Sequence, residues 1–170
     1  NRTGAAGDTW FFLTVAYGYG ANIERDMTDM ITSSGGKVIG DAKHPFETED
    51  FSSDLMRAQG SNASIIGLAT TTMHAGKVIK QAEEFGLRKA GKKCAAPSMT
   101  CHDVKALGLP LAQDISTVEA FYWEQTDATR AFSKRYFDAF GRMPNMNQAS
   151  AYGAVTHYLK AVQAAGSTDN

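Results

Sequence analysis

The sequence predicts an α/β fold: a Rossmann-like parallel sheet with helices on both faces, followed by two C-terminal helices. Three observations predict it. Short apolar runs alternate with segments of helical periodicity, as in βαβ units. The first run, WFFLTV at 10–15, is almost continuously apolar, which is typical of a strand buried on both faces of a parallel sheet. After Asp127 only helical periodicity remains.

The first half of the chain is predicted to alternate strands and helices. Between the first two strands, apolar residues recur at i, i+4, i+7 and i+8 from Ile23, which marks one face of a helix. Gly35 and Gly36 end that helix. The predicted elements are a strand at 10–15, a helix at 21–34, a strand at 37–42, a short helix capped by Asp50, and a strand at 64–69.

The second half continues the alternation and then changes to helices alone. The helix after the third strand has its apolar face at Val78, Ile79, Ala82 and Phe85 and ends at Gly86. Predicted next are a weak strand at 93–98, a short helix at 103–107 with Asp103 as its N-cap, a fifth strand at 115–123, a helix carrying Phe132, Tyr136 and Phe140, and a helix from about 147 carrying Tyr152, Val155, Leu159 and Val162.

Composition is that of an ordinary globular domain, with 43% hydrophobic and 21% charged residues. A net charge of -1 offers no basic surface for nucleic acid or an anionic membrane, so neither is predicted as a partner. The chain begins at Asn1 without a methionine and shows no signal peptide. We therefore expect further sequence upstream.

Motifs for cofactors, metals and catalysis are incomplete. The turn at Tyr17–Gly20 has two glycines of a dinucleotide fingerprint, but Ile23 occupies the third position, and no phosphate-loop lysine follows. Cys94 and Cys101 are spaced for either a disulfide or two separate thiols, and with His102 they fall short of the four ligands usual for structural zinc. No cofactor, metal or catalytic residue is predicted.

The candidate site follows from position. In an open parallel sheet, ligands bind beyond the carboxyl ends of the strands, where helix N-termini present N–H groups. The residues expected there are hydroxyl-bearing, small or aromatic, and mostly uncharged, which suits a small molecule. They lie in four clusters, 17–20, 70–73, 98–102 and 121–123.

In this order and spacing, the chain from Thr9 to Gly166 resembles the periplasmic solute-binding proteins of branched-chain-amino-acid-type ABC transporters, the type I periplasmic binding proteins. The matching stretches are GDTWFFLTVAYGYGANIERD, GGKVIGDAKHPFETEDFSSDL, KQAEEFGL, DVKALGL with AQD, AFYWEQTDATRAFSKRY, and FGRMPNMNQASAYGAVTHYLKAVQAAG.

The resemblance implies two Rossmann-like lobes with a solute between them, of which this chain carries the second, roughly 7–119. Residues 1–123 would then form the second-lobe α/β domain with a crossing strand. Residues 124–170 would form a helical pair that packs on the first lobe, upstream of this chain. Exchange of that pair between two copies, giving a homodimer, is another way to cover its apolar face.

The family's solute-contacting tyrosine and glycine correspond to Tyr19 and Gly20. The resemblance and the strand-end positions together give the predicted ligand-binding residues Tyr19, Gly20, Thr71, Thr72, Met73, Ser98, Met99, Thr100 and Tyr122. Amino-acid binders of the family place an acidic side chain in the loop that reads APSMT here, at 96–100, where none is present. The expected solute is therefore a small organic acid without an ammonium group, an aromatic carboxylate being favoured over an aliphatic acid.

The predicted function is solute binding for an ABC importer, in the periplasm, with the membrane permease as a partner and no enzymatic activity. The alternatives are binding of a branched-chain or other amino acid, a cofactor-using Rossmann-like enzyme domain, and a ligand-sensing domain of a receptor, since the same fold serves sensors.

Overall fold

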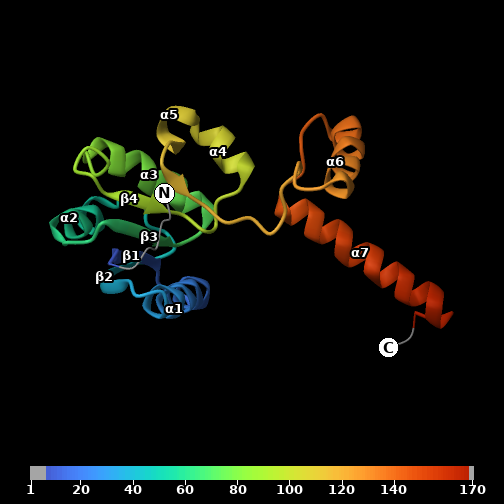
Figure 1. The fold of residues 1–170 in the computed structure, drawn as a ribbon, viewed down its shortest axis with the longest axis horizontal. Helices are drawn as coiled ribbons and strands as arrows, with labels where there is room; N and C mark the ends of the chain where they lie inside the picture. The colour runs from blue at the N-terminus through green and yellow to red at the C-terminus, as the bar shows by residue number, and fades with distance from the viewer. Residues whose placement is uncertain (1–6, 169–170) are drawn as a thin grey trace. The chain divides into compact units, whose positions relative to one another are not determined.

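A computed structural model describes residues 7–168 of the 170-residue chain. The chain forms two compact units, Asn1–Val118 and Glu119–Asn170, called here the first and the second unit. The first unit is α/β and the second is helical, as the sequence predicts (Figure 1).

The first unit is built on a five-stranded sheet in the order β2-β1-β3-β4-β5, with every neighbouring pair parallel (Figure 1). The predicted parallel sheet is confirmed. The most apolar strand, β1, lies between β2 and β3 and is buried from Trp10 to Val15. The strands are β1 (Thr9–Val15), β2 (Lys37–His44), β3 (Ile65–Ala69), β4 (Lys93–Ala95) and β5 (Ile115–Ser116).

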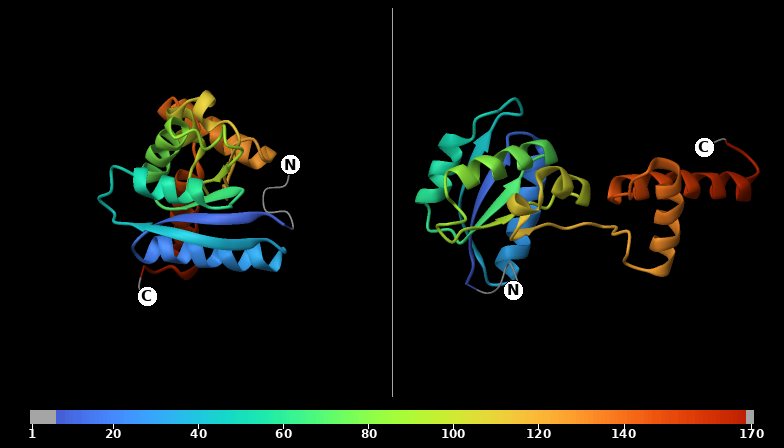
Figure 2. Two further views of the ribbon diagram at one scale, coloured as in Figure 1. Left: turned by 90° about the vertical axis from the view of Figure 1, so that its left-hand side faces the viewer. Right: turned by 90° about the horizontal axis from the view of Figure 1, so that it is seen from above.

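Helices cover both faces of this sheet (Figure 2). One face packs on α1, and the other packs on α2 and α3, because successive residues of β1 point to opposite sides. The helices of the first unit are α1 (Gly18–Ser33), α2 (Ser52–Gly60), α3 (Thr72–Glu84), α4 (Cys101–Leu107) and α5 (Leu109–Ala112).

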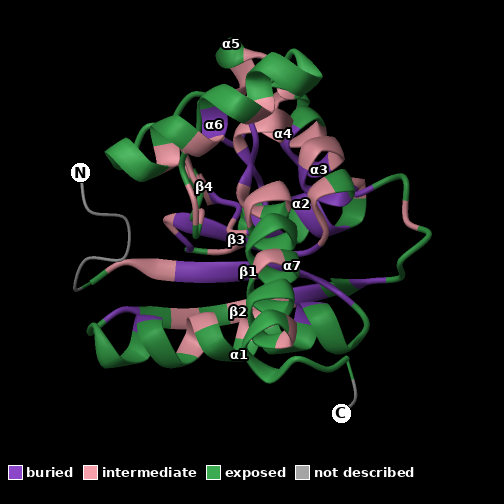
Figure 3. Cartoon of the chain, turned by 90° about the vertical axis from the view of Figure 1, so that its right-hand side faces the viewer, coloured by how far each residue is buried: buried purple, intermediate pink, exposed green. Residues whose placement is uncertain are grey.

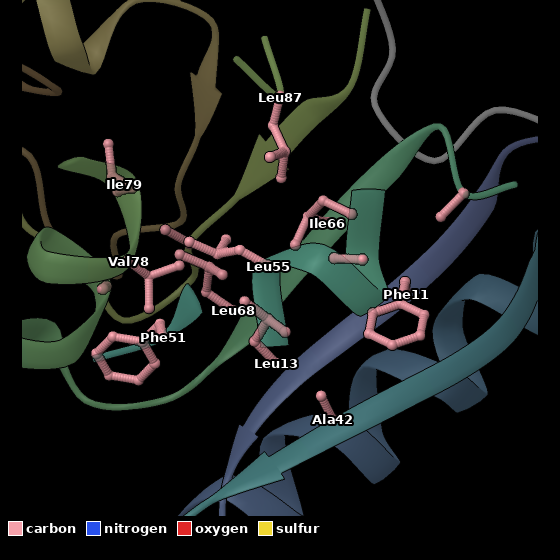
Figure 4. Packing of buried hydrophobic residues seen from close by; sticks show 14 of the residues in the cluster. Phe11, Leu13, Ala42, Phe51, Leu55, Ile66, Leu68, Val78, Ile79 and Leu87 are labelled. Atoms are coloured by element: carbon pink, nitrogen blue, oxygen red, sulfur yellow. The ribbon is translucent and has the colours of Figure 1, made fainter. Parts of the chain in front are cut away.

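Two apolar clusters form the core on the two faces. Trp10 and Phe12 pack with Ile31 of α1, whereas Phe11 and Leu13 pack with the side of α2 and α3. The second cluster is the larger one and includes Phe51, Leu55, Leu68, Val78 and Ile79 (Figure 4). Both clusters anchor the middle of the sheet, so the strand ends project from a rigid base.

Strands β4 and β5 are shorter than predicted. β4 stops at Ala95 rather than Ser98, and β5 stops at Ser116 rather than Trp123. Pro97 has no N–H to donate, so the ladder beyond Ala96 has no continuation. Because β5 pairs with β4, it ends where its partner ends, after the bond from Ala96 N–H to Ser116 O (2.8 Å).

Three helix starts also differ from prediction. α1 begins at Gly18, three residues earlier than Ala21. At α2 the N-cap is Phe51, and the Asp50 carboxylate accepts from the N–H and the hydroxyl of Ser52. At α4 the predicted N-cap, Asp103, is instead the third helical residue. Its carboxylate accepts from the N–H (2.8 Å) and the hydroxyl (2.7 Å) of Thr100, so it closes a capping box.

The second unit contains the two predicted helices, α6 (Asp127–Phe140) and α7 (Met146–Ala165). Thr126 and Asn145 cap their N-termini, and a left-handed glycine, Gly141 or Gly166, follows each C-terminus. No residue of α7 is buried. Tyr152, Val155 and Leu159 of its predicted apolar face are exposed, and Val162 is intermediate (Figure 3). Most of that face is therefore uncovered within the second unit.

Cys94 and Cys101 are not joined by a disulfide, so the two thiols stay separate. Burial raises the pKa of the Cys94 thiol to about 12, which keeps it protonated at neutral pH. Over residues 7–168, no helix has both the length and the apolar character needed to cross a membrane.

Candidate functional site

The register of the sheet brings the ends of three strands together. Val15 lies beside His44, and Thr14 lies beside Ala69, so β1, β2 and β3 end at the same edge. The N–H of Ala16 donates to His44 O (2.8 Å) and extends the pairing by one residue. The segments that follow these strands form the exposed carboxyl edge of the first unit.

Gly20 allows α1 to sit against this edge. A Cβ at this position would lie 2.3 Å from Val15 O and 2.9 Å from Ala69 O. Both neighbours are backbone atoms of the sheet, which cannot move aside easily. Only glycine lets the helix start this close to the ends of β1 and β3, and this closeness places Tyr19 directly above the edge.

A chain of hydrogen bonds joins the ends of β1, β3 and β4. The Tyr19 hydroxyl donates to Ser98 Oγ (3.1 Å), and the Ser98 hydroxyl donates to Thr70 O (2.7 Å). Ser98 and Thr70 are buried, whereas Tyr19 remains 43% exposed. Tyr19 is therefore held from below by this hydrogen bond while much of the residue stays exposed.

A buried histidine pair lies beneath the same edge. His44 Nε2 is 3.1 Å from Thr70 Oγ1, and Thr70 Oγ1 is 3.2 Å from His74 Nδ1. His44 Nδ1 is buried without a hydrogen-bond partner. An unpaired acceptor costs less than an unpaired buried N–H, so we assign the His44 proton to Nε2, donating to Thr70, whose hydroxyl donates to His74.

The stability of the fold should depend on pH through His44. Burial and the neighbouring His74 lower the pKa of His44 from 6.5 to about 4. The unfolded chain thus binds more protons between these values, so the free energy of unfolding should fall as pH falls from the unfolded pKa towards the folded one. His44 should lower the free energy of unfolding by about 2 kcal/mol at about pH 5 relative to about pH 7.5, as measured by urea unfolding. In His44→Gln this part of the pH dependence should vanish. The control variant His157→Gln, at an exposed histidine of α7, should retain it. An unchanged pH profile in His44→Gln would contradict the lowered pKa of His44.

Aromatic side chains line the same edge. Tyr17 stacks on Tyr19 with ring centroids 6.1 Å apart, and Phe46 meets Tyr17 edge-on at 5.9 Å. Phe46 also lies edge-on to His74 at 5.4 Å. We call Tyr17, Tyr19 and Phe46 the aromatic array. Each of these three residues is 43–47% exposed. Met73, which precedes His74 in the sequence, is 55% exposed. Exposed rings in contact with one another are typical of a binding surface.

The other predicted site residues lie in different environments. Thr71 caps α3 by accepting from His74 N–H (3.4 Å), Thr72 is half-buried, and Met73 is exposed. Met99 is fully buried in the core, and Thr100 is buried at the start of α4. Tyr122 belongs to the second unit, where its ring lies 5.4 Å from that of Trp123. The structure thus joins Tyr19 and Ser98 directly, and it leaves no exposed surface on Met99.

The charged residues of the carboxyl edge lie in the loop after β2, which carries Glu47, Glu49 and Asp50 beside Phe46. The loops after β1, β3 and β4, at 16–17, 70–71 and 96–100, contain no Asp, Glu, Lys or Arg. Tyr17 gives no side-chain cap to α1, so it leaves the first-turn N–H groups without an acceptor from its side chain. The edge therefore offers hydroxyls, backbone N–H groups and aromatic faces.

Outside this edge, the described residues offer an apolar cavity but no cluster suited to a metal. An apolar cavity of about 60 Å³ lies between α3, β4 and α5, with Leu68, Ile79 and Ile115 in its wall, and none of the predicted site residues lines it. No group of three His, Cys, Asp or Glu side chains suited to a metal occurs within the described part of the chain. Cys94, Cys101 and His102 thus form no such group.

Sequence reasoning missed His44, Phe46 and His74. His44 and Phe46 lay just past a strand that was predicted to end at Ala42, although the strand runs on to His44. His74 follows Thr70 by four residues, a helical spacing that brings side chains together at the start of α3. The available signal was a histidine at the end of β2, together with Thr70 just after β3 and His74 four residues further on.

The solved structures that match this chain share its fold over nearly its whole length. A periplasmic binding protein from Burkholderia mallei is 46% identical with a TM-score of 0.89, over 96% of this chain and 43% of that one. A branched-chain amino acid ABC transporter periplasmic ligand-binding protein from Burkholderia xenovorans is 39% identical with a TM-score of 0.80, over 94% and 43%. A solute-binding protein of an ABC transporter from Rhodopseudomonas palustris, in complex with 3,4-dihydroxybenzoic acid, is 21% identical with a TM-score of 0.79, over 94% and 44%.

This chain spans less than half the length of those proteins. A comparison with proteins of curated function found no significant match. The family model described as periplasmic binding protein matches residues 2–170. The predicted family and fold are confirmed: the chain belongs to the periplasmic binding protein family.

Proposed function

We propose that this chain is the second lobe of the solute-binding component of an ABC importer, and that its carboxyl edge forms one wall of the solute cleft. The chain of hydrogen bonds from Tyr19 through Ser98 to Thr70 carries the proposal. It links three strand ends into one fixed surface while leaving Tyr19 accessible. Structural residues of a core would not need that exposure.

The solute we propose is a small organic acid, with an aromatic carboxylate first. The aromatic array offers faces for a ring, and the first-turn N–H groups of α1 and the Thr71 and Thr72 hydroxyls offer donors for a carboxylate. The absence of an acidic side chain at 96–100 argues against an α-ammonium, because an unpaired buried charge is costly. The fold occurs elsewhere with an aromatic acid bound.

Amino-acid binding is the alternative solute class. It is favoured by the relative from Burkholderia xenovorans, which is described as a branched-chain amino acid transporter protein. Asp103, the acidic residue nearest the loop, is engaged with both donors of Thr100 and would have to leave its capping box to meet an ammonium. Glu119, in the second unit, is the other carboxylate that could meet an ammonium.

A thermal-shift panel on the protein as its gene encodes it tests the solute class. At about a hundred times its dissociation constant, a bound solute stabilises by roughly 2.7 kcal/mol, which is readily detected. Benzoate should raise the midpoint, and leucine and valine should not. A shift with leucine but not with benzoate would show that the reading of the 96–100 loop is wrong.

Closure and partners follow from the proposed role. The solute would touch both lobes in the closed form, so binding would draw them together by a hinge motion, and the permease would recognise that form. The family points to the periplasm as the compartment. We propose that residues 124–170, with the exposed Tyr152, Val155 and Leu159 of α7, pack on the first lobe.

Exchange of α6 and α7 between two copies is the alternative way to cover this apolar face in a chain limited to residues 1–170. Light scattering coupled to size-exclusion chromatography separates the two cases. Packing on an upstream lobe predicts that the longer protein is a monomer, whereas exchange predicts that the 170-residue chain is a dimer. A 170-residue chain that stays monomeric with an unprotected α7 would contradict the exchange.

A further inference from the structure

The direction of two hydrogen bonds fixes what Tyr19 can offer a solute. Thr70 O is a carbonyl oxygen and can only accept, so the Ser98 proton is committed to it (2.7 Å). Ser98 Oγ can then only accept from Tyr19, whose proton is committed in turn (3.1 Å). The Tyr19 hydroxyl oxygen therefore presents lone pairs, and no proton, to anything above the edge.

This orientation is held firmly. Thr70 is fully buried and Ser98 is 7% exposed, so water does not compete for their hydrogen bonds. Turning the Tyr19 proton towards a solute would leave the Ser98 oxygen short of a donor in a dry site, at a cost of about one hydrogen bond. Stacking on Tyr17 also fixes the plane of the ring.

A solute group that meets Tyr19 must therefore donate. A carboxylate oxygen or a bare ring edge has no proton to give, whereas a hydroxyl or an ammonium has, and the proposed solute class carries no ammonium. The loops after β1, β3 and β4 contain no carboxylate that could accept from the same group. The acidic residues of this edge lie in the loop after β2, where Glu49 pairs with Lys77 and Asp50 accepts from Ser52. Thr71 behaves in the opposite way to Tyr19: it accepts from His74 N–H and keeps its own proton to donate.

From these directions we infer that the solute is a hydroxylated organic acid, and that Tyr19 reads its hydroxyl as an acceptor. This inference rests on the proposed function, since it takes the carboxyl edge as the solute wall. Ser98 is the positioning residue, because it sets the direction of the Tyr19 proton without touching the solute. The preference should be for a hydroxyl over a group of similar size that cannot donate.

Hydroxybenzoates and fluorobenzoates test this preference, because fluorine is close to a hydroxyl in size but cannot donate. Calorimetry on the protein as its gene encodes it should give a meta- or para-hydroxybenzoate at least about tenfold tighter than its fluoro counterpart, the factor for one good hydrogen bond. Tyr19→Phe should remove this difference by weakening only the hydroxylated solute. Tyr136→Phe, in the second unit, should preserve it.

Ser98→Ala gives a signature that a purely structural role would not produce. Without the serine oxygen, the Tyr19 proton is released and can turn towards the solute, so the preference for a hydroxyl should shrink to about threefold or less. Equal binding of fluoro and hydroxy compounds by the unaltered protein, or an unchanged preference in Tyr19→Phe, would overturn this inference alone. Binding of leucine with no benzoate-class binding would overturn the proposed solute class together with it.

Discussion

Replacing Gly20 by alanine is expected to lower the free energy of unfolding by about 3 kcal/mol and to abolish solute binding. The added Cβ would lie 2.3 Å from Val15 O and 2.9 Å from Ala69 O. Both atoms belong to the backbone at the ends of adjacent strands, so relief requires α1 to move away from the sheet. Tyr19 would then lose its position over Ser98.

Gly76 provides the matched control, because it lies inside α3 and a Cβ there meets nothing within 4 Å. Gly76→Ala should stabilise the protein by up to about 1 kcal/mol through helix propensity. Urea unfolding of the two variants measures the difference in the free energy of unfolding, provided that both show the same dependence on urea concentration. A loss of under about 1 kcal/mol in Gly20→Ala would mean that the close approach of α1 is not required.

Replacing Phe51 by alanine is expected to cost about 4 kcal/mol of stability, the range for a fully buried aromatic ring. Phe51 has no exposed surface and belongs to the core between the sheet and α2. Its ring also meets His44 edge-on at 4.9 Å and His74 at 5.8 Å. Its loss would open a cavity beneath the histidine pair that supports the site.

Phe46 serves as the exposed counterpart, since its ring also touches His74 but is 47% exposed. Phe46→Ala should cost under about 1 kcal/mol, because little buried area is lost. Denaturant midpoints of the two variants give the comparison. Equal losses of stability in Phe51→Ala and Phe46→Ala would contradict the difference in burial between the two rings.

Much of the fold could be predicted because the signals are local and periodic. The continuous apolar run at 10–15 predicted the buried strand β1, and the spacing of Ile23, Met27 and Ile31 predicted α1. Gly35 and Gly36 marked the end of α1, after which Gly35 adopts a positive φ (83°). The end of β5 was missed, because it depends on a pairing with β4 that Pro97 cuts short.

The candidate site was predictable only in part. The strand ends could be identified, and with them Tyr19 and Ser98, because parallel strands end at one edge. Their hydrogen bond could not, since it spans 79 positions in the sequence and depends on how closely α1 approaches the sheet. The burial of Met99 likewise depends on the path of the chain after Pro97, which no periodicity reveals.

Mapping a bound solute by amide NMR tests the central claim most directly. When benzoate or a hydroxybenzoate is added to the protein as its gene encodes it, we expect the largest shifts in this chain at 17–20, 70–73 and 98–100. Shifts confined to the cavity between α3, β4 and α5, around Leu87, Leu111 and Ile115, would instead contradict the assignment of the carboxyl edge as the solute wall.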